Sequence, residues 1–158
     1  MKENTANPPD KIQRAAAHYA KLVEAQLRRV EAMKARTDFV DYGKLGTIRI
    51  GICGGDGIGP VITSEAARVL RRLLEREVRA GRVEFRPIDG LTIENRVKAG
   101  KTIPDDVLAA LKECHVILKG PTTTPRAGDP WPNMESANVA MRRELDLFAN
   151  VRPVKIPD

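Results

Sequence analysis

The segment Ile48–Ile62, IRIGICGGDGIGPVI, decides the fold that this sequence predicts. Residues 47–53 form an apolar run of strand length, and the glycines that follow mark a tight turn. Pro60 then stands at the first position of a helix, where its missing N–H removes no hydrogen bond. The segment therefore predicts a strand, a glycine turn and a helix in direct succession.

The downstream sequence repeats this alternation. We expect strands over 47–53, 83–88 and 115–119, and helices over 60–80, 92–99 and 104–113. Alternating strands and helices are typical of a mostly parallel sheet flanked by helices, so the predicted fold class is α/β. The loops that begin at Gly54 and Gly120 should open at the carboxyl edge of the sheet, where such proteins bind ligands.

The glycine loop partly fits a dinucleotide-binding fingerprint. Gly55 and Gly57 have the required spacing, but Pro60 stands where a third small residue is needed. No acidic residue ends a second strand about twenty positions further on. We therefore interpret the loop as a structural turn, with a position at the edge of a site as the alternative.

Residues 1–46 form an N-terminal helical arm and linker, separate from the main body at 47–158. Apolar residues recur every three or four positions over 10–36, which predicts one long amphipathic helix. These residues are Ile12, Ala16, Tyr19, Val23, Leu27, Val30 and Met33. The pattern is too short to identify a coiled coil, and we expect the helix to pack on its own domain or on a partner.

Composition narrows the class of protein. The chain has 158 residues, a net charge of +6 and 42% hydrophobic residues, with no apolar run long enough for a membrane span. The basic excess lies in the arm without interleaved aromatic residues, so we expect neither a nucleic-acid nor a membrane partner. Cys53 and Cys114 fit core thiols in a reducing compartment, which favours a cytoplasmic protein.

A dense set of polar side chains lies between 119 and 155. Ser136 can cap a helix over 137–145 through its side chain, and Asn138 and Arg142 are then four residues apart on one face. A strand-like stretch, 148–154, would deliver Arg152 to the same region. Arginine is suited to bidentate binding of carboxylates, so the set fits a site for a small polycarboxylate.

The same residues also allow a purely structural interpretation. Ser136 would then be only a helix cap, Arg142 and Arg143 part of a solvated face, and Arg152 a surface cation.

Several motifs carry a resemblance to a known family. KGPTTTP at 119–125, SANVAMRRELDLF at 136–148 and RP at 152–153 resemble the isocitrate dehydrogenases, as does the segment Ile48–Ile62. Their family also contains isopropylmalate and homoisocitrate dehydrogenases. The resemblance spans about residues 48–153. Ser136 and Asn138 favour isocitrate, because isopropylmalate dehydrogenases usually lack this Ser-x-Asn pair.

The resemblance implies roles for individual residues. Ser136, Asn138, Arg142 and Arg152 would bind the substrate, which would be isocitrate or a similar 2-hydroxy polycarboxylate. The cofactor-binding residues would be Lys119, Thr123, Thr124 and Asn138, at the nicotinamide end of NAD or NADP. The loop 125–135 is several residues longer than in the family that the chain resembles, which leaves its path over the site open.

The family's chemistry also requires groups that the matched region lacks. Hydride transfer to NAD or NADP, followed by decarboxylation, needs a Tyr, a Lys and acidic ligands for Mg²⁺ or Mn²⁺. We therefore expect no catalytic and no metal-ligating residue in this chain, which would be inactive alone. We expect it to be the N-terminal part of a dehydrogenase, assembled with a completing polypeptide or as a homo-oligomer. The alternative is a non-catalytic carboxylate-binding or regulatory subunit.

Overall fold

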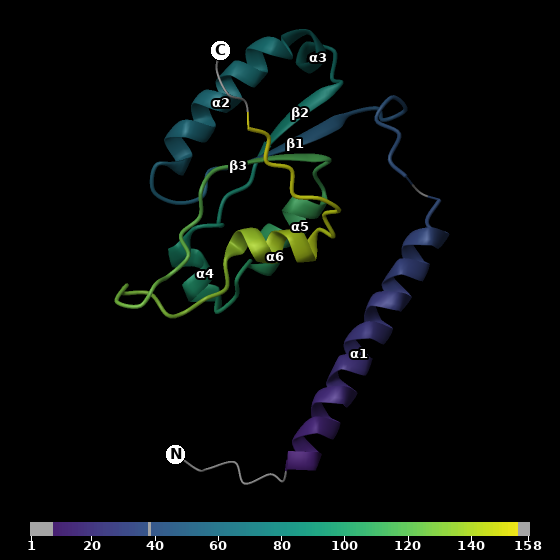
Figure 1. Cartoon of the computed structure of the whole chain (residues 1–158). Helices are drawn as coiled ribbons and strands as arrows, with labels where there is room; N and C mark the ends of the chain where they lie inside the picture. The colour runs from purple at the N-terminus through teal and green to yellow at the C-terminus, as the bar shows by residue number, and fades with distance from the viewer. Residues whose placement is uncertain (1–7, 38, 155–158) are drawn as a thin grey trace. The chain divides into compact units, whose positions relative to one another are not determined.

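The computed structural model describes residues 8–37 and 39–154. The chain divides into two units, Met1–Asp41 and Tyr42–Asp158. The described part of the first unit contains helix α1, Pro8–Ala35, shown in Figure 1. The long helix predicted over 10–36 is therefore confirmed, with both ends displaced by one or two residues. None of the described helices is both long enough and apolar enough to span a membrane.

The second unit contains a parallel sheet. Its strands are β1 (Ile48–Cys53), β2 (Val83–Pro87) and β3 (Val116–Lys119), and its helices are α2 (Gly59–Leu73), α3 (Glu75–Arg79), α4 (Ile93–Ala99), α5 (Asp105–Lys112) and α6 (Ala137–Glu144). Within the described residues the strand order is β2-β1-β3, with both pairings parallel. Helices α2 and α3 lie on one face of the sheet and α4, α5 and α6 on the other (Figure 1). The predicted α/β architecture is confirmed.

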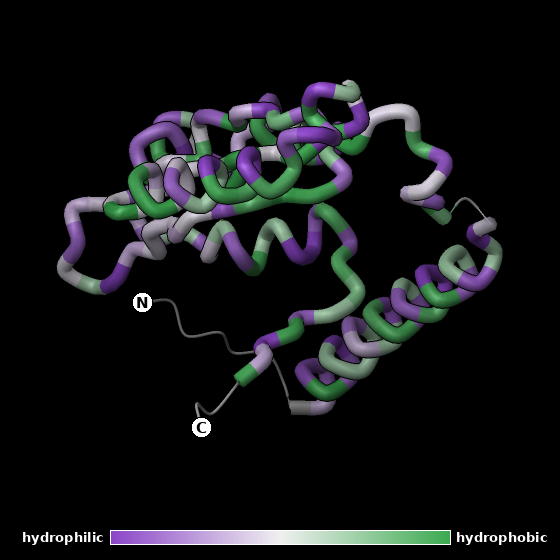
Figure 2. The backbone as a smooth tube through the Cα atoms, turned by 90° about the horizontal axis from the view of Figure 1, so that it is seen from above, coloured by the Kyte–Doolittle hydropathy of each residue, from purple (hydrophilic) through white to green (hydrophobic). Residues whose placement is uncertain are grey.

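The main core lies between the sheet and helices α5 and α6. Figure 2 shows hydrophobic residues along the strands, whereas along α1 hydrophobic and hydrophilic residues alternate. The buried members of the core are Cys53, Ile88, Leu91, Ile103, Val107, Leu111, Ala137, Ala140 and Met141. Burial of side chains from α6 against this core fixes the helix that carries the candidate polar residues.

The helix predicted over 60–80 is interrupted in the structure. Helix α2 begins at Gly59, one residue earlier than expected, and ends at Leu73. Leu74 has φ −101° and ψ 20°, outside the helical range, and separates α2 from the short α3. The Leu74 N–H still donates to the Leu70 carbonyl and the Leu74 carbonyl accepts from Val78, so the interruption is local.

The prediction of a strand-like stretch over 148–154 was wrong. These residues have no regular secondary structure, and Phe148 is 93% exposed. A strand is stable only when its N–H and C=O groups pair with a neighbour. In the part of the chain that the structure describes, no strand pairs with this segment. Its apolar residues alone were not enough to form one.

Candidate functional site

Two loops meet at the carboxyl edge of the sheet. The loop after β1 and the loop after β3 pack backbone against backbone, so closely that a Cβ on Gly55 would stand 2.0 Å from the Pro121 oxygen. A Cβ on Gly120 would stand 2.1 Å from the Gly54 oxygen. The Asp56 N–H donates to the Pro121 carbonyl at 2.8 Å. Gly55 and Gly120 are therefore required by this contact.

Asp56 joins these two loops to a third. Its Oδ1 accepts the N–H of Ile93 at 2.8 Å, at the first residue of α4. Its Oδ2 accepts the N–H of Thr123 at 2.6 Å, in the loop after β3. A carboxylate that accepts backbone N–H groups forms strong, charge-assisted hydrogen bonds, and here one of them lies at the positive end of a helix. Asp56 thus fixes the position of Thr123 relative to the glycine loop.

Arg96 is a fully buried cation that holds three carbonyl groups. Its Nε donates to the Thr102 oxygen at 2.8 Å, its Nη1 to the Thr123 oxygen at 2.7 Å and its Nη2 to the Glu135 oxygen at 2.9 Å. Burial lowers the pKa of Arg96, and the charge of Asp56 acts against that effect. Arginine remains protonated in proteins, so the side chain is a permanent triple donor.

The Arg96 guanidinium closes the long loop between β3 and α6. Its bonds to Thr123 and Glu135 hold the two ends of residues 124–134 together, and so bring Thr123 and Thr124 near Ser136. Neither Arg96 nor Asp56 was predicted from the sequence. The spacing does indicate that Arg96 is buried, because it lies three residues after Ile93, on the side of α4 that faces the core.

Ser136 occupies the N-cap position of α6, but its side chain makes no capping hydrogen bond. The predicted side-chain cap was therefore wrong. The backbone carbonyl of Ser136 accepts the N–H groups of Val139 and Ala140 instead, which starts the helix without the hydroxyl. The hydroxyl therefore remains available at the amino end of α6, where the helix dipole favours anions.

Two neighbouring arginines on α6 differ in their contacts. Arg143 binds both carboxylate oxygens of Glu135, at 2.7 and 3.0 Å. Arg142 and Asn138 are exposed and lie four residues apart on the other flank of the helix. Within residues 8–37 and 39–154 neither of these two side chains has a hydrogen-bond or ion-pair partner. Arg142 is thus available for a ligand, while Arg143 is held by Glu135.

Lys119 lies at the end of β3 and is half-buried. Its ammonium donates to the Gly120 carbonyl at 2.6 Å and to the Thr122 hydroxyl at 3.2 Å. Burial lowers the pKa of Lys119, and the nearby Cys53 and Asp56 act against this effect. Thr122, which the sequence analysis passed over, therefore orients the lysine, whereas Thr123 is held through its backbone.

The lowered pKa of Lys119 gives a pH dependence with a definite sign. The unfolded chain holds this proton to higher pH than the folded chain, so stability rises with pH in the window just below the ordinary lysine value. We expect the stability of the wild type relative to Lys119→Met to increase as the pH rises toward the ordinary lysine pKa of 10.5. Urea unfolding of both proteins at each pH measures this difference, and a constant difference would contradict the assignment.

Arg152 is not brought into contact with the other candidates. It lies in the irregular segment 148–154, which leaves the body as an extended trace in Figures 1 and 2. Its side chain is exposed. The structure therefore places Ser136, Asn138 and Arg142 at α6, Lys119 at the end of β3, and Thr123 and Thr124 in the loop after β3. Arg152 lies apart from them in the irregular segment.

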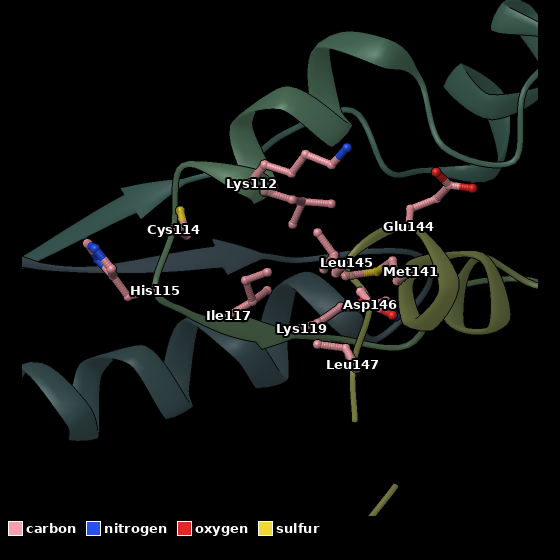
Figure 3. A pocket seen from close by; sticks show the side chains of 11 residues that line it. Lys112, Cys114, His115, Ile117, Lys119, Met141, Glu144, Leu145, Asp146 and Leu147 are labelled. Carbon is pink, nitrogen blue, oxygen red and sulfur yellow. The ribbon is translucent and has the colours of Figure 1, made fainter. Parts of the chain in front are cut away.

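A pocket of about 550 Å³ lies between β3 and the carboxyl end of α6. Figure 3 shows Ile117 of β3 and Met141 and Leu145 at α6 gathered around it. The candidate residue Lys119 is among the residues that line it, whereas Ser136, Asn138 and Arg142 are not. The pocket is therefore separate from the polar groups of α6.

Comparison with known proteins gives a consistent result. The sequence profile described as isocitrate/isopropylmalate dehydrogenase matches residues 49–158. The isocitrate dehydrogenase (NADP) of Caldococcus noboribetus is 40% identical over 112 residues, which cover 64% of this chain and 23% of that protein. The 3-isopropylmalate dehydrogenase of Streptococcus pneumoniae is 38% identical over 104 residues, which cover 66% of this chain and 29% of that protein.

The chain thus spans about a quarter of the length of the curated relatives that it matches. Isocitrate and isopropylmalate dehydrogenases match at nearly the same identity, so the family is identified without its substrate. The profile covers the sheet, the two contacting loops and α6 together. The chain belongs to the isocitrate/isopropylmalate dehydrogenase family.

Proposed function

We propose that this chain supplies the substrate-holding part of an NAD(P)-dependent, decarboxylating isocitrate dehydrogenase, whose remaining part supplies the catalytic groups. The observation that carries the proposal is the contrast between Arg142, which has no partner among the described residues, and Arg143, which is bound by Glu135. Membership of the isocitrate/isopropylmalate dehydrogenase family, whose model matches residues 49–158, supports the proposal.

The residues of α6 suit a ligand with several carboxylates. Arg142 can donate two parallel N–H bonds to one carboxylate, and each charge-assisted bond contributes about 1.5–3 kcal/mol. The Ser136 hydroxyl can donate to a second carboxylate at the amino end of the helix, and the Asn138 amide can both donate and accept. Isocitrate has three carboxylates and one hydroxyl, which matches this set of donors. Arg152 would join them if its segment packs against α6 in the whole enzyme.

Lys119 with Thr123 and Thr124 would border the nicotinamide ribose. The bound NAD or NADP would accept the hydride, and a divalent cation would polarise the substrate oxygen. Within the described residues no group of three or more His, Cys, Asp or Glu side chains could hold a metal ion. In this proposal, Lys119, Thr123, Thr124 and the residues of α6 bind and orient the substrate and the nicotinamide end of the cofactor.

Reconstitution tests this proposal. The chain is expressed together with the isocitrate dehydrogenase of Caldococcus noboribetus from which the matching quarter has been removed. We expect reduction of NADP that depends on isocitrate and on the added chain. Arg142→Ala should lower kcat/KM by at least about a hundredfold, while Arg143→Ala, the matched control, should lower it much less.

The outcomes separate the alternatives. Equal activity of the wild type and Arg142→Ala would contradict the role of Arg142. The chain is nearly as similar to an isopropylmalate dehydrogenase as to an isocitrate dehydrogenase, so 3-isopropylmalate is the second candidate substrate. Isocitrate, 3-isopropylmalate and homoisocitrate are therefore compared in one assay. Binding of isocitrate by a complex that reduces no cofactor would instead indicate a regulatory subunit.

A further inference from the structure

Helix α1 presents a long apolar face that the proposed function does not use. Ile12 is 70% exposed, Tyr19 67% and Leu27 58%. Apolar residues repeat along this face at a spacing of eleven residues, from Ile12 to Val23 and from Tyr19 to Val30. This spacing corresponds to about 3.67 residues per turn, which keeps the stripe nearly straight along a helix. Two such helices can therefore stay in contact over their full length.

The two flanks of this face carry opposite charge. Lys11, His18 and Arg29 are separated by seven and eleven residues, so they lie along one flank. Glu24 and Glu31 are separated by seven residues and lie along the other, where Glu24 also forms an exposed ion pair with Arg28 of the same helix at 3.6 Å. In a parallel pair of identical helices, the left flank of one faces the right flank of the other, whereas an antiparallel pair brings like flanks together. Only the parallel arrangement brings opposite charges together.

We propose that α1 pairs in parallel and in register with α1 of a second copy of this chain. The apolar face supplies the contact, and the flank with Arg29 in one copy meets the flank with Glu31 in the other. Charge complementarity of this kind selects the orientation of helix pairs. The pairing joins two bodies of the chain and lies outside the candidate substrate site.

An anionic membrane surface is the competing occupant of a basic amphipathic helix. Such helices carry Lys and Arg on the polar face and Trp, Phe or Leu on the apolar face. In α1 the apolar face contains neither Trp nor Phe, and one flank is acidic at Glu24 and Glu31. A negative surface would repel that flank, so the pattern favours a second copy.

Sedimentation equilibrium of the full chain between about 1 and 100 µM tests the pairing. Val23→Asp places a charge on the apolar face, and Ala25→Asp places the same charge on the polar side of the same turn. We expect Val23→Asp to raise the dissociation constant of the dimer by at least about tenfold, and Ala25→Asp to leave it nearly unchanged. Far-ultraviolet circular dichroism of both variants checks that α1 remains helical.

Two further variants test the charged flanks. Glu24→Lys with Glu31→Lys makes both flanks basic, and Lys11→Glu with Arg29→Glu makes both acidic. Each protein alone should dimerise more weakly than the wild type, and their mixture should form heterodimers. Orientation is tested by oxidation of Ile12→Cys in a background with Cys53→Ala and Cys114→Ala, since only parallel pairs bring the two new cysteines together.

Each result has a definite meaning. A wild-type chain that stays monomeric over this range would overturn the proposal, and so would equal loss of the dimer in Val23→Asp and Ala25→Asp. Cross-linking only when Ile12→Cys is mixed with Met33→Cys would show an antiparallel pair and also overturn it. A monomer that binds phosphatidylserine vesicles would replace it by membrane-surface binding. Dimers lost in Val23→Asp and restored in the charge-reversed mixture would establish it.

Discussion

Arg96→Leu is expected to lower the free energy of unfolding by about 3–5 kcal/mol. The leucine fills much of the space but donates no hydrogen bond, so the carbonyls of Thr102, Thr123 and Glu135 lose their partner in a buried site. An unsatisfied buried carbonyl costs about 1–3 kcal/mol, and partial relaxation keeps the total below the simple sum. Urea unfolding followed by circular dichroism gives the value from the midpoint and slope.

Arg126→Leu is the control for this substitution, because Arg126 is an exposed arginine on the same loop. We expect a change within about 0.5 kcal/mol for a surface position of this kind. The loss of unfolding free energy in Arg96→Lys should lie between the losses in these two variants. An ammonium keeps the charge but lacks the planar group of donors that reaches three carbonyls. If Arg96→Leu unfolded at the same urea concentration as the wild type, the role of Arg96 in closing the loop would be refuted.

Gly55→Ala is expected to lower the free energy of unfolding by about 3–5 kcal/mol, as much as Arg96→Leu. Gly55 has φ +73°, a conformation that costs an alanine about 1–2 kcal/mol. Its new Cβ would also stand 2.0 Å from the Pro121 oxygen, so the two loops must separate. Their separation stretches the hydrogen bond from the Asp56 N–H to Pro121. A thermal melt of the variant measures the loss.

Gly57→Ala separates these two causes. Gly57 has φ +57°, but nothing lies within 4 Å of the position that a Cβ would take. It should therefore show only the conformational cost of about 1–2 kcal/mol. Equal losses at Gly55 and Gly57 would mean that the contact between the loops contributes nothing.

The fold could be predicted from the sequence largely because its signals are local. Strand-length apolar runs and Pro60 at a helix start each specify the structure of their own neighbourhood. The prediction of a strand over 148–154 was wrong because a strand depends on a neighbouring strand, which the local sequence does not specify. The prediction that the Ser136 side chain caps α6 was wrong because the residue type gives only a preference for this hydrogen bond, which the structure does not form.

The candidate site was less predictable, for a different reason. Arg142 and Arg143 are adjacent and chemically identical. They differ because Arg143 binds the carboxylates of Glu135 and Glu144, whereas Arg142 binds neither. Arg96 stands in a helix with other charged residues, where an arginine is ordinarily solvated. Its three acceptors come from segments that the fold brings together, and no local pattern indicates them.

The closure of 124–134 by Arg96 also bears on how this region can diverge. Because one side chain fixes Thr123 and Glu135, the residues between them can change in number without displacing Ser136. Lengthening a closed loop is cheap, since each doubling of its length costs only about 0.6 kcal/mol in chain entropy. The segment is therefore a place where insertions are tolerated, and where an epitope or a reporter peptide could be grafted into this fold.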